Sequence, residues 1–398
     1  MTAFHATAVD HKALRAYRLG RVREQLRRRD YGGILLYDPL NIRYATDTSN
    51  MQVWTLHNAV RYAFIPTEGP VTLFDFHGCG HLSAQIEVVD EVRAATGWFY
   101  FGAGEEAPVR VQSWADELLE LIKQHCGTNN RIAVDKLDPL GVWALEERQI
   151  DIQDGQQVME IAREVKNHLE LAAMKESIAA CQEGMRRMRA ALEPGITENK
   201  LWSILHQTNI EMGGEWIETR LLTSGQRTNP WFQECSNRVI QKGDIVSFDT
   251  DLIGPNGYCS DISRTWRCGG GKPTDEQRRL YAVAREQIRF NIDLLRPGMT
   301  FKEFAEKSFQ LPDEFVANRY SVVFHGVGLC DEYPGVVYAQ DWEHGGYDGV
   351  IQENMTVCVE SLVGTEGGRE CIKLEEQVHV TASGAKQLST YPFEDDWL

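Results

Sequence analysis

The sequence predicts an α+β protein with an α/β domain over residues 1–160 and a second domain over residues 161–398. Three observations support this prediction. Apolar segments with helical and strand periods alternate through the first domain. A long helix opens the second domain, and a helix–turn–helix motif occurs in it twice. Carboxylates on strand-like segments gather in the second domain, so we expect the chemistry there.

The first domain is expected to be compact and to carry no cluster of catalytic residues. Gly32 and Gly33 mark the end of its first helix, and the segment 66–70 has the composition of a turn between two strands. The expected helices cover residues 12–30 and 111–126, and the expected strands cover residues 33–37, 62–65, 71–76 and 131–135.

The second domain contains a candidate internal sequence repeat. A helix is expected at 167–192, and the segment Leu192-Glu-Pro-Gly-Ile-Thr197 at its end recurs as Leu295-Arg-Pro-Gly-Met-Thr300. A Pro-Gly stop followed by a threonine N-cap is common, so chance similarity is the alternative. The matching leucine and the equal helix–turn–helix context favour duplication. Such a repeat predicts a curved sheet with helices outside and a concave inner face.

The charge balance excludes several classes of partner. Lysine and arginine number 41 against 58 acids, a net charge of −17, which argues against nucleic acid or an anionic membrane as a partner. The first ten residues lack the apolar core of an export signal, and no apolar run is long enough to span a bilayer. We therefore expect a cytoplasmic protein that does not bind membranes.

Nine cysteines are scattered along the chain and form no Cys-x-x-Cys pair. Reduced thiols are therefore expected. Four of them lie close in sequence to acidic residues that could bind metal, but a small buried hydrophobic role is favoured over ligation for each. These four are Cys259, Cys330, Cys358 and Cys371.

Three aspartates are expected to converge. Asp249 and Asp251 are two residues apart in a strand-like segment, so both carboxylates should point to one face. Asp261 lies beyond the turn 254–257 on the returning strand of a hairpin. Solvated turns are the alternative for such acids. Three neighbouring carboxylates repel one another unless cations bind between them, so we favour a metal site.

Further donors follow later in the chain, each on a strand-like segment. Together they make five carboxylates and one imidazole, a set that suits two neighbouring divalent cations and leaves positions open for water or substrate. This composition favours a catalytic over a structural site. The full predicted set is Asp249, Asp251, Asp261, His325, Glu360 and Glu375.

These motifs resemble those of the creatinase/aminopeptidase P/methionine aminopeptidase superfamily. The similarity spans about 165–390 and includes Ser-Asp-Ile-Ser-Arg-Thr-Trp at 260–266, His-Gly-Val-Gly-Leu at 325–329 and Ile-Lys-Leu-Glu-Glu-Gln-Val at 372–378. The resemblance implies a pita-bread catalytic fold in the second domain. It also implies a non-catalytic first domain that makes dimer contacts, and hence a homodimer.

Three departures from the peptidases of this superfamily bear on function. Thr250 stands eleven residues before Asp261, where those peptidases carry an aspartate. They carry a histidine where this chain has Asp331-Glu332, and another substrate-binding histidine in the region of Asn229-Pro-Trp-Phe232. Peptide-bond hydrolysis is therefore not the favoured activity.

The departures resemble a branch of metal-dependent dimethylsulfoniopropionate lyases. Segments at 41–47, 213–222, 227–234, 248–254 and 325–332 carry this likeness along most of the chain. It implies β-elimination from a small zwitterionic substrate to dimethyl sulfide and acrylate. It also implies that the six donors bind two divalent metal ions, with iron as first choice and manganese, cobalt or zinc as alternatives.

The same resemblance suggests roles for four further residues. It makes Asp331 the general base, and it makes Tyr320 a catalytic residue that lines the pocket. Trp54, Trp231 and Tyr320 would contact the substrate, with Trp54 contributed by the partner subunit. The alternatives are a solvated acid for Asp331, a core aromatic for Tyr320 and dimer packing for Trp54.

Two other functions remain open from the sequence. One is a dinuclear-metal hydrolase of the same fold, either similar to Xaa-Pro aminopeptidase or prolidase or acting on a small-molecule C–N bond. The other is a binding module without catalysis, which the complete set of donors disfavours.

Overall fold

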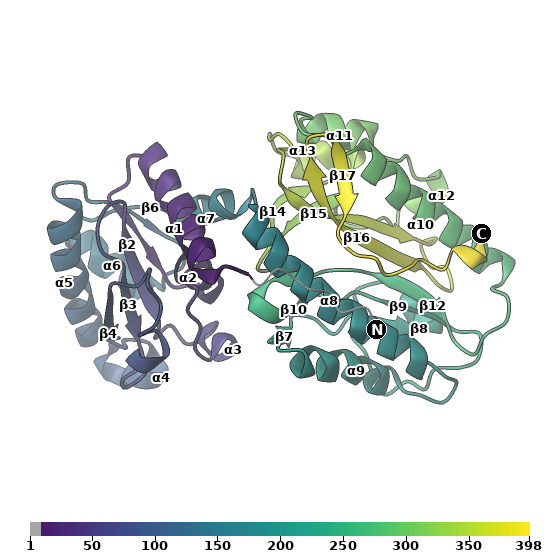
Figure 1. Cartoon of the computed structure of the whole chain (residues 1–398), viewed down its shortest axis with the longest axis horizontal. Helices are drawn as coiled ribbons and strands as arrows, with labels where there is room; N and C mark the ends of the chain where they lie inside the picture. Colours follow the sequence, from purple (N-terminus) through teal and green to yellow (C-terminus); the bar gives the residue numbers. More distant parts are fainter. Residues whose placement is uncertain (1–8) are drawn as a thin grey trace. The chain divides into compact units, whose positions relative to one another are not determined.

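The structure is a computed structural model that describes residues 9–398 (Figure 1). The first eight residues, on which the expectation about export partly rests, lie outside the described residues. The chain forms two compact units, Val9–Arg163 and Glu164–Leu398. The predicted boundary after residue 160 falls inside a helix that ends at Arg163. Over residues 9–398, no helix combines the length and apolarity needed to cross a bilayer.

The N-terminal unit, drawn in purple to blue in Figure 1, is built on a six-stranded mixed sheet of order β4-β3-β2-β1-β5-β6. The strands are β1 (Gly33–Leu36), β2 (Tyr62–Pro66), β3 (Thr72–Asp75), β4 (Glu91–Ala94), β5 (Arg131–Val134) and β6 (Asp151–Asp154). The helices are α1 (His11–Arg28), α2 (Pro39–Thr46), α3 (Gln52–Thr55), α4 (Tyr100–Ala103), α5 (Ala107–Cys126), α6 (Pro139–Glu147) and α7 (Gly155–Arg163). The predicted α/β domain is confirmed, as is the antiparallel hairpin of β2 and β3.

An aromatic core stabilises this unit. Trp114 on α5 is fully buried and lies 5.2 Å, ring to ring, from Trp98, while Tyr62 stacks on Phe74 at 4.3 Å. Large buried rings remove much apolar area from water, and tilted or offset pairs add to this. The first unit thus has a hydrophobic core of its own.

The C-terminal unit contains three sheets, of orders β11-β10-β7, β12-β9-β8 and β14-β13-β15-β16-β17. Its strands are β7 (Trp216–Ile217), β8 (Leu222–Ser224), β9 (Ile245–Phe248), β10 (Leu252–Ile253), β11 (Cys259–Ser260), β12 (Arg264–Arg267), β13 (Phe324–Val327), β14 (Asp331–Val336), β15 (Thr356–Val363), β16 (Ile372–Thr381) and β17 (Gly384–Gln387). Its helices are α8 (His168–Ala191), α9 (Glu198–Glu211), α10 (Asp275–Leu294), α11 (Phe301–Lys307), α12 (Asp313–Val316) and α13 (Trp342–Gly345).

The expectation of one curved sheet is wrong, because the strands of the first half are interrupted. The predicted hairpin exists, with its turn at 254–257, but each of its arms is split into two short strands. The breaks fall at 249–251 and 261–263, where the acidic residues lie. Carboxylates that must converge on one point cannot all follow a regular pleat.

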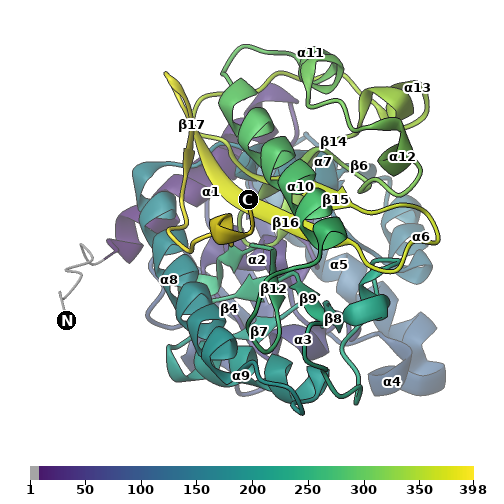
Figure 2. The same cartoon turned by 90° about the vertical axis from the view of Figure 1, so that its right-hand side faces the viewer.

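Helices cover the sheets from outside. Helix α10 runs along β15 and β16 in both views (Figures 1 and 2). Leu280, Ala284 and Ile288, on one face of α10, belong to the same buried cluster as Val357 and Leu374 of those strands. A second cluster joins α8 and α9 to β8, β9 and β12. The opposite sheet faces are thus left for the acidic residues.

The predicted duplication is visible in the backbone. Leu192 is the C-cap of α8 and α9 begins after Thr197, just as Leu295 is the C-cap of α10 and α11 begins after Thr300. Both threonines are N-caps, and each pairs with a later segment through a single antiparallel bridge. The two copies therefore share their local structure and not only their sequence.

Glycine is required in each turn of the repeat. Gly195 and Gly298 have φ angles of 106° and 90°, a region that other residues rarely adopt. The backbone N–H of Gly195 donates to the carbonyl of Ile240, and that of Gly298 donates to the carbonyl of Ile351. The same hydrogen bond therefore closes both turns.

The duplication reaches the acidic cluster. Asp249 and Glu360 each lie nine residues beyond the isoleucine that closes the turn of their copy. Asp249 directly follows β9, and Glu360 lies within β15. Corresponding positions of the two copies thus carry one predicted ligand each.

Candidate metal centre

Asp249, Asp251 and Asp261 converge as predicted, although not on an extended strand. One carboxylate oxygen from each lies within 4.8 Å of the others. The strand β9 stops before Asp249, and Asp251 has a φ of +35°. The local prediction of a regular strand is wrong, because a turn of the backbone rather than the strand period brings the two acids together.

Backbone contacts fix this turn. The backbone N–H of Asp249 donates to the carbonyl of Leu221 at 2.9 Å, and the carbonyl of Asp251 accepts from Glu218 at 3.0 Å. The side chain of Asp251 also accepts a hydrogen bond from the hydroxyl of Thr219. A non-glycine residue at positive φ costs free energy, and such strain is found at functional sites.

Asp261 also belongs to a second group of donors. Its carboxylate, the imidazole of His325, the thiol of Cys358 and the carboxylate of Glu375 each offer an atom within 4.8 Å of the rest. His325 lies on β13 and Glu375 on β16, so these two predicted strand positions are confirmed. Asp261 thus lies at the junction of two adjacent donor groups, as a centre for two ions would require.

The orientation of His325 suits metal binding. Its Nδ1 lies 3.0 Å from the carbonyl oxygen of Gly326, which can only accept, so Nδ1 carries the proton. Nε2 then points at carboxylate oxygens of Glu360 at 3.2 Å, Glu375 at 3.4 Å and Asp261 at 3.5 Å. Burial alone would lower the pKa of the imidazole, but the neighbouring carboxylates raise it well above the usual value, so without an ion Nε2 also holds a proton. A ring nitrogen aimed at three acids is an arrangement in which a metal cation can replace that proton.

The electrostatics of the cluster also fit a cation. Burial and the charge of Glu375 raise the pKa values of Asp249 and Glu360 to about 7. Burial and neighbouring carboxylates raise the pKa values of Asp251 and Asp261 well above their usual range. Buried Asp261 Oδ1 has no hydrogen-bond partner. The buried acids therefore cannot all ionise unaided, and this donor set fits divalent cations.

Cys358 is the one thiol within this donor group. Burial raises its pKa well above the usual value, followed by the effects of Asp261 and Glu375, so the thiol keeps its proton. Its Sγ lies 3.6 Å from the backbone carbonyl of Asp261. All nine cysteines are free thiols, as predicted. The expected role as a small buried residue suits Cys358 better than ligation.

Asp331 lies beside the cluster but differs from the other acids in its exposure. It is the first residue of β14, and its Oδ1 lies 3.8 Å from Nδ1 of His325. Its side chain is 47% exposed, whereas those of Asp261 and Glu360 are at most 2% exposed. Asp331 is therefore the accessible carboxylate of this group, as a general base must be.

Tyr320 is half-buried next to the cluster. Burial raises its pKa far above the usual value, so the phenol stays protonated. Its ring stacks on Phe232, with centroids 5.5 Å apart and planes inclined by 26°. Nζ of Lys373 lies 4.6 Å from the centroid of the same ring. An aromatic ring thus links the buried acids to the surface.

Trp231 and Phe232 are neighbours in sequence with different surroundings. Trp231 is 5% exposed and packs in an apolar cluster with Leu362 and Cys371. Phe232 is 60% exposed and has a φ of +66°, which is uncommon for a bulky residue. Trp231 was predicted to contact the substrate and Phe232 was not, because a pair of adjacent aromatics gives no signal for which ring is accessible.

Trp54 belongs to the N-terminal unit, on the short helix α3. Its half-buried ring contacts the rings of Phe76, Phe99 and Phe101, at centroid distances of 5.2, 6.5 and 6.5 Å. Several large apolar side chains on α3, on α4 and directly beside α3 are exposed. They are Met51, Val53, Leu56, Tyr100 and Phe101.

Lys373 was also missed as a site residue. Its side chain is fully buried, and Nζ lies 2.7 Å from Glu360 and 3.1 Å from Asp249. Burial alone would lower its pKa, but the surrounding carboxylates raise it well above the usual value, so the ammonium stays charged. The position of Lys373 could have been predicted from the sequence, since Lys373 and Glu375 are two residues apart on β16 and share a face.

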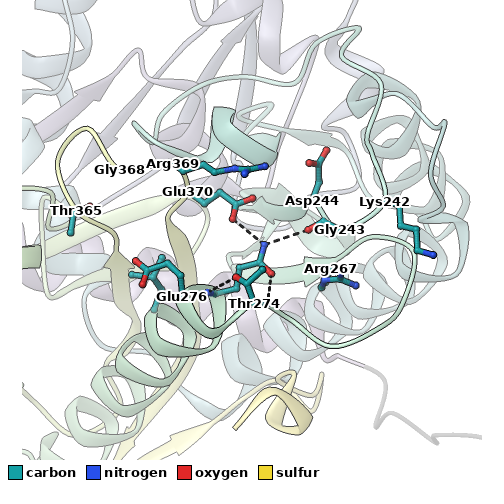
Figure 3. A pocket seen from close by; sticks show the side chains of 12 residues that line it. Lys242, Gly243, Asp244, Arg267, Thr274, Glu276, Thr365, Gly368, Arg369 and Glu370 are labelled. Carbon is teal, nitrogen blue, oxygen red and sulfur yellow. Dashed lines mark hydrogen bonds between the residues drawn. The ribbon is translucent and has the colours of Figure 1, made fainter.

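A cavity of about 400 Å³ lies elsewhere in the unit, at the N-terminus of α10 (Figure 3). Arg267, Arg369 and Glu370 line it, and Gln277 beside them donates hydrogen bonds to Gly243 and Glu370. It contains none of the predicted site residues. Among residues 9–398, the donor groups that suit a metal are those around Asp261.

Comparison with known proteins shows the family of the chain. Residues 172–382 match the model of metallopeptidase family M24. The chain is 43% identical over 390 residues to dimethylsulfoniopropionate lyase DddP of Roseovarius nubinhibens, covering 97% of this chain and 87% of that protein. It is 42% identical over 392 residues to DddP of Roseobacter denitrificans, with the same coverage.

Two solved peptidase structures have the same fold. An Xaa-Pro dipeptidase from Bacillus anthracis aligns over 96% of this chain and 99% of its own, with a TM-score of 0.75 and 20% identity. A prolidase from Pyrococcus horikoshii aligns over 95% and 99%, with a TM-score of 0.75 and 18% identity. The predicted α+β fold with a pita-bread catalytic domain is therefore confirmed. The chain belongs to metallopeptidase family M24.

Proposed function

We propose that this protein is a metal-dependent lyase that cleaves dimethylsulfoniopropionate into dimethyl sulfide and acrylate. The similarity to two DddP proteins along 97% of the chain supports the choice of substrate. The single observation that carries the reaction type is the exposed carboxylate of Asp331 beside a buried acidic cluster. An accessible base next to a cation site is what proton removal from a carbon next to a carboxylate requires.

The proposed metal centre uses all six predicted donors, with two divalent ions and iron as the first choice. Carboxylate and imidazole donors also accept manganese, cobalt and zinc, so metal content must be measured. When bound, such ions supply Lewis-acid stabilisation of the negative charge that develops on a substrate carboxylate. The residues that would hold them are Asp249, Asp251, Asp261, His325, Glu360 and Glu375.

Asp331 is the base in the proposed elimination. Its carboxylate removes the proton from the carbon next to the substrate carboxylate. The C–H electron pair becomes the new C=C bond, and the C–S bond breaks with its electrons going to sulfur. Dimethyl sulfide leaves as a neutral molecule, so no acid is needed for its departure, and acrylate remains. Asp331 then returns the proton to water, which its 47% exposure permits.

The sulfonium end of the substrate is positively charged and needs an uncharged surface that attracts cations. Aromatic faces do this, and the attraction is about 1–2 kcal/mol when the cation is desolvated. Tyr320 and Phe232 form a stacked pair next to the acidic cluster, with Trp231 packed behind them. We assign the cationic end to this aromatic wall.

The proposal includes a homodimer in which Trp54 of one subunit contributes to the site of the other. It is supported by the exposed apolar side chains around Trp54, which a monomer would leave in water. Light scattering of the purified protein measures the mass directly. A monomer with unchanged turnover in Trp54→Ala would exclude this part of the proposal.

A hydrolase of the same fold is the second candidate, because the solved neighbours are Xaa-Pro dipeptidases and prolidases. The test is a comparison of substrates. Protein loaded with Fe²⁺ or Mn²⁺ is incubated with dimethylsulfoniopropionate, and the headspace is analysed for dimethyl sulfide by gas chromatography. An Xaa-Pro dipeptide is assayed in parallel. Release of proline without dimethyl sulfide would replace the lyase by the hydrolase.

A further inference from the structure

The ammonium group of Lys373 lies inside the carboxylate cluster. Its Nζ is 2.7 Å from Glu360 Oε2, 3.1 Å from Asp249 Oδ2 and 3.2 Å from Glu375 Oε2. It also donates to Ser263 Oγ at 2.7 Å. An ammonium has three N–H donors, and four oxygens already surround this one. Lys373 therefore has no hydrogen left for a substrate, so its role concerns the cluster itself.

Lys373 and His325 face opposite sides of the same acids. The lysine contacts Oε2 of both Glu360 and Glu375. The Nε2 of His325 instead points at Oε1 of both, at 3.2 and 3.4 Å. A cation bound by the imidazole would therefore use the oxygens that the lysine does not contact, and both could be present together.

The strand arrangement shows why a charge is needed there. Glu360 and Glu375 are direct partners across β15 and β16, and like charges in such a pair destabilise a sheet. Both side chains are buried, so water cannot screen them. Lys373 is two residues from Glu375 on the same face. Its charge therefore offsets this repulsion in the folded chain without any bound ion.

We propose that Lys373 is a resident cation of the site, which holds Asp249, Glu360 and Glu375 together before metal binds and stays among them afterwards. This inference rests on the metal centre of the proposed function. Five ligand carboxylates, two divalent ions and one ammonium sum to a formal charge of zero, so the lysine also completes the neutralisation of the loaded site. Lys373 acts as a positioning residue and does not touch the substrate.

The test compares Lys373→Met with wild type in the metal-free and metal-loaded states. Methionine keeps most of the side-chain length and removes the charge. Metal is removed with a chelator, Mn²⁺ is added as the probe, and thermal unfolding is recorded in both states. Without metal, the midpoint of Lys373→Met should fall by about 10 °C, because three buried carboxylates lose a partner. Mn²⁺ should raise the midpoint more in the variant than in wild type, since it replaces the missing charge.

Two further variants sharpen the comparison. Lys307→Met removes an exposed lysine that pairs with Glu303, and it should change neither state. Lys373→Arg keeps the charge and should recover most of the metal-free stability. An equal loss for Lys373→Met with and without Mn²⁺ would show a packing role only and overturn the inference, as would no loss beyond that of Lys307→Met.

A variant that fails to fold is also informative. If Lys373→Met is soluble only when expressed with added Mn²⁺, the inference is supported, and insolubility in both media overturns it. The proposed function is judged separately. If Mn²⁺ changes neither the stability nor the bound-metal content of wild type, the metal centre is refuted, whereas the metal-free loss in Lys373→Met still decides whether the lysine holds the acids together.

Discussion

Glu360 and His325 meet across neighbouring strands, with Glu360 Oε1 3.2 Å from His325 Nε2. The Nδ1–H of His325 donates to the carbonyl of Gly326, so Nε2 is directed at this carboxylate. An acceptor aimed at an acceptor is unfavourable unless a proton or a cation lies between them. This contact makes His325 the most direct probe of the metal centre.

We expect His325→Ala to lose at least one of two bound metal ions, measured by mass spectrometry of the purified protein after removal of free metal. The imidazole is the only neutral donor of the proposed set, and its loss leaves acids facing one another. His379→Ala is the matched control, since His379 lies on β16 but contacts Asn354 instead of the acids. Full metal content in His325→Ala would contradict the assignment.

We expect Asp331→Asn to lower turnover of dimethylsulfoniopropionate by about 10²–10⁴ while metal content is unchanged. The amide keeps the shape of the carboxylate but cannot accept the proton. In wild type, substrate deuterated next to the carboxylate should react more slowly if proton removal limits the rate. Asp348→Asn, an exposed acid outside the site, serves as control. Near-normal turnover in Asp331→Asn would exclude it as the base.

Phe232→Ala should raise KM for dimethylsulfoniopropionate by about 5–30-fold with little change in kcat, because a cation–π contact of about 1–2 kcal/mol is lost. Phe232→Tyr keeps an aromatic face and should resemble wild type. Phe290→Ala removes another exposed ring, on α10, which lies outside the proposed site. If the two alanine variants behave alike, the aromatic wall does not bind the substrate.

The ion pair between Lys166 and Glu332 provides a prediction about stability. Both side chains are at most 1% exposed, and Glu332 directly follows Asp331. Lys166→Met should lower the free energy of unfolding by about 3–5 kcal/mol, since one member of a buried pair remains. The exposed pair of Lys307 and Glu303 should contribute less than about 1 kcal/mol when broken. Denaturant titration of Lys166→Met and Lys307→Met measures both free energies of unfolding. Equal losses in the two variants would show that burial does not strengthen the first ion pair.

Much of the architecture could be predicted because the signals are local. The helix expected at 167–192 is α8 (His168–Ala191), and both threonines predicted as N-caps have this role. The repeat was detectable for the same reason, since a Pro-Gly turn between two helices is written in a few consecutive residues. His325, Glu360 and Glu375 lie in regular strands, in which alternate side chains share a face, so their convergence could be predicted.

The parts that could not be predicted depend on distant contacts. The turn at Asp251 is held by Glu218 and Thr219, and nothing in the sequence around residue 250 reveals those partners. The exposure of Phe232 beside the buried Trp231 likewise follows from packing against Tyr320 and Leu362. Lys373 differs, because its place beside Glu375 was readable from the strand period once a charged face was considered.

The interrupted strands divide the predicted ligands into two groups that differ in backbone hydrogen bonding. His325, Glu360 and Glu375 lie in one hydrogen-bonded sheet, while Asp249, Asp251 and Asp261 lie in the gaps between short strands. Amides in a continuous ladder open rarely, and those in irregular segments open more often. Hydrogen exchange of backbone amides in the metal-free protein should therefore be slow around the donors in the continuous sheet and fast around the three aspartates. If the proposed metal centre is correct, cation binding should slow exchange mainly at the aspartates, because the ions would then connect these interrupted strands to the continuous sheet.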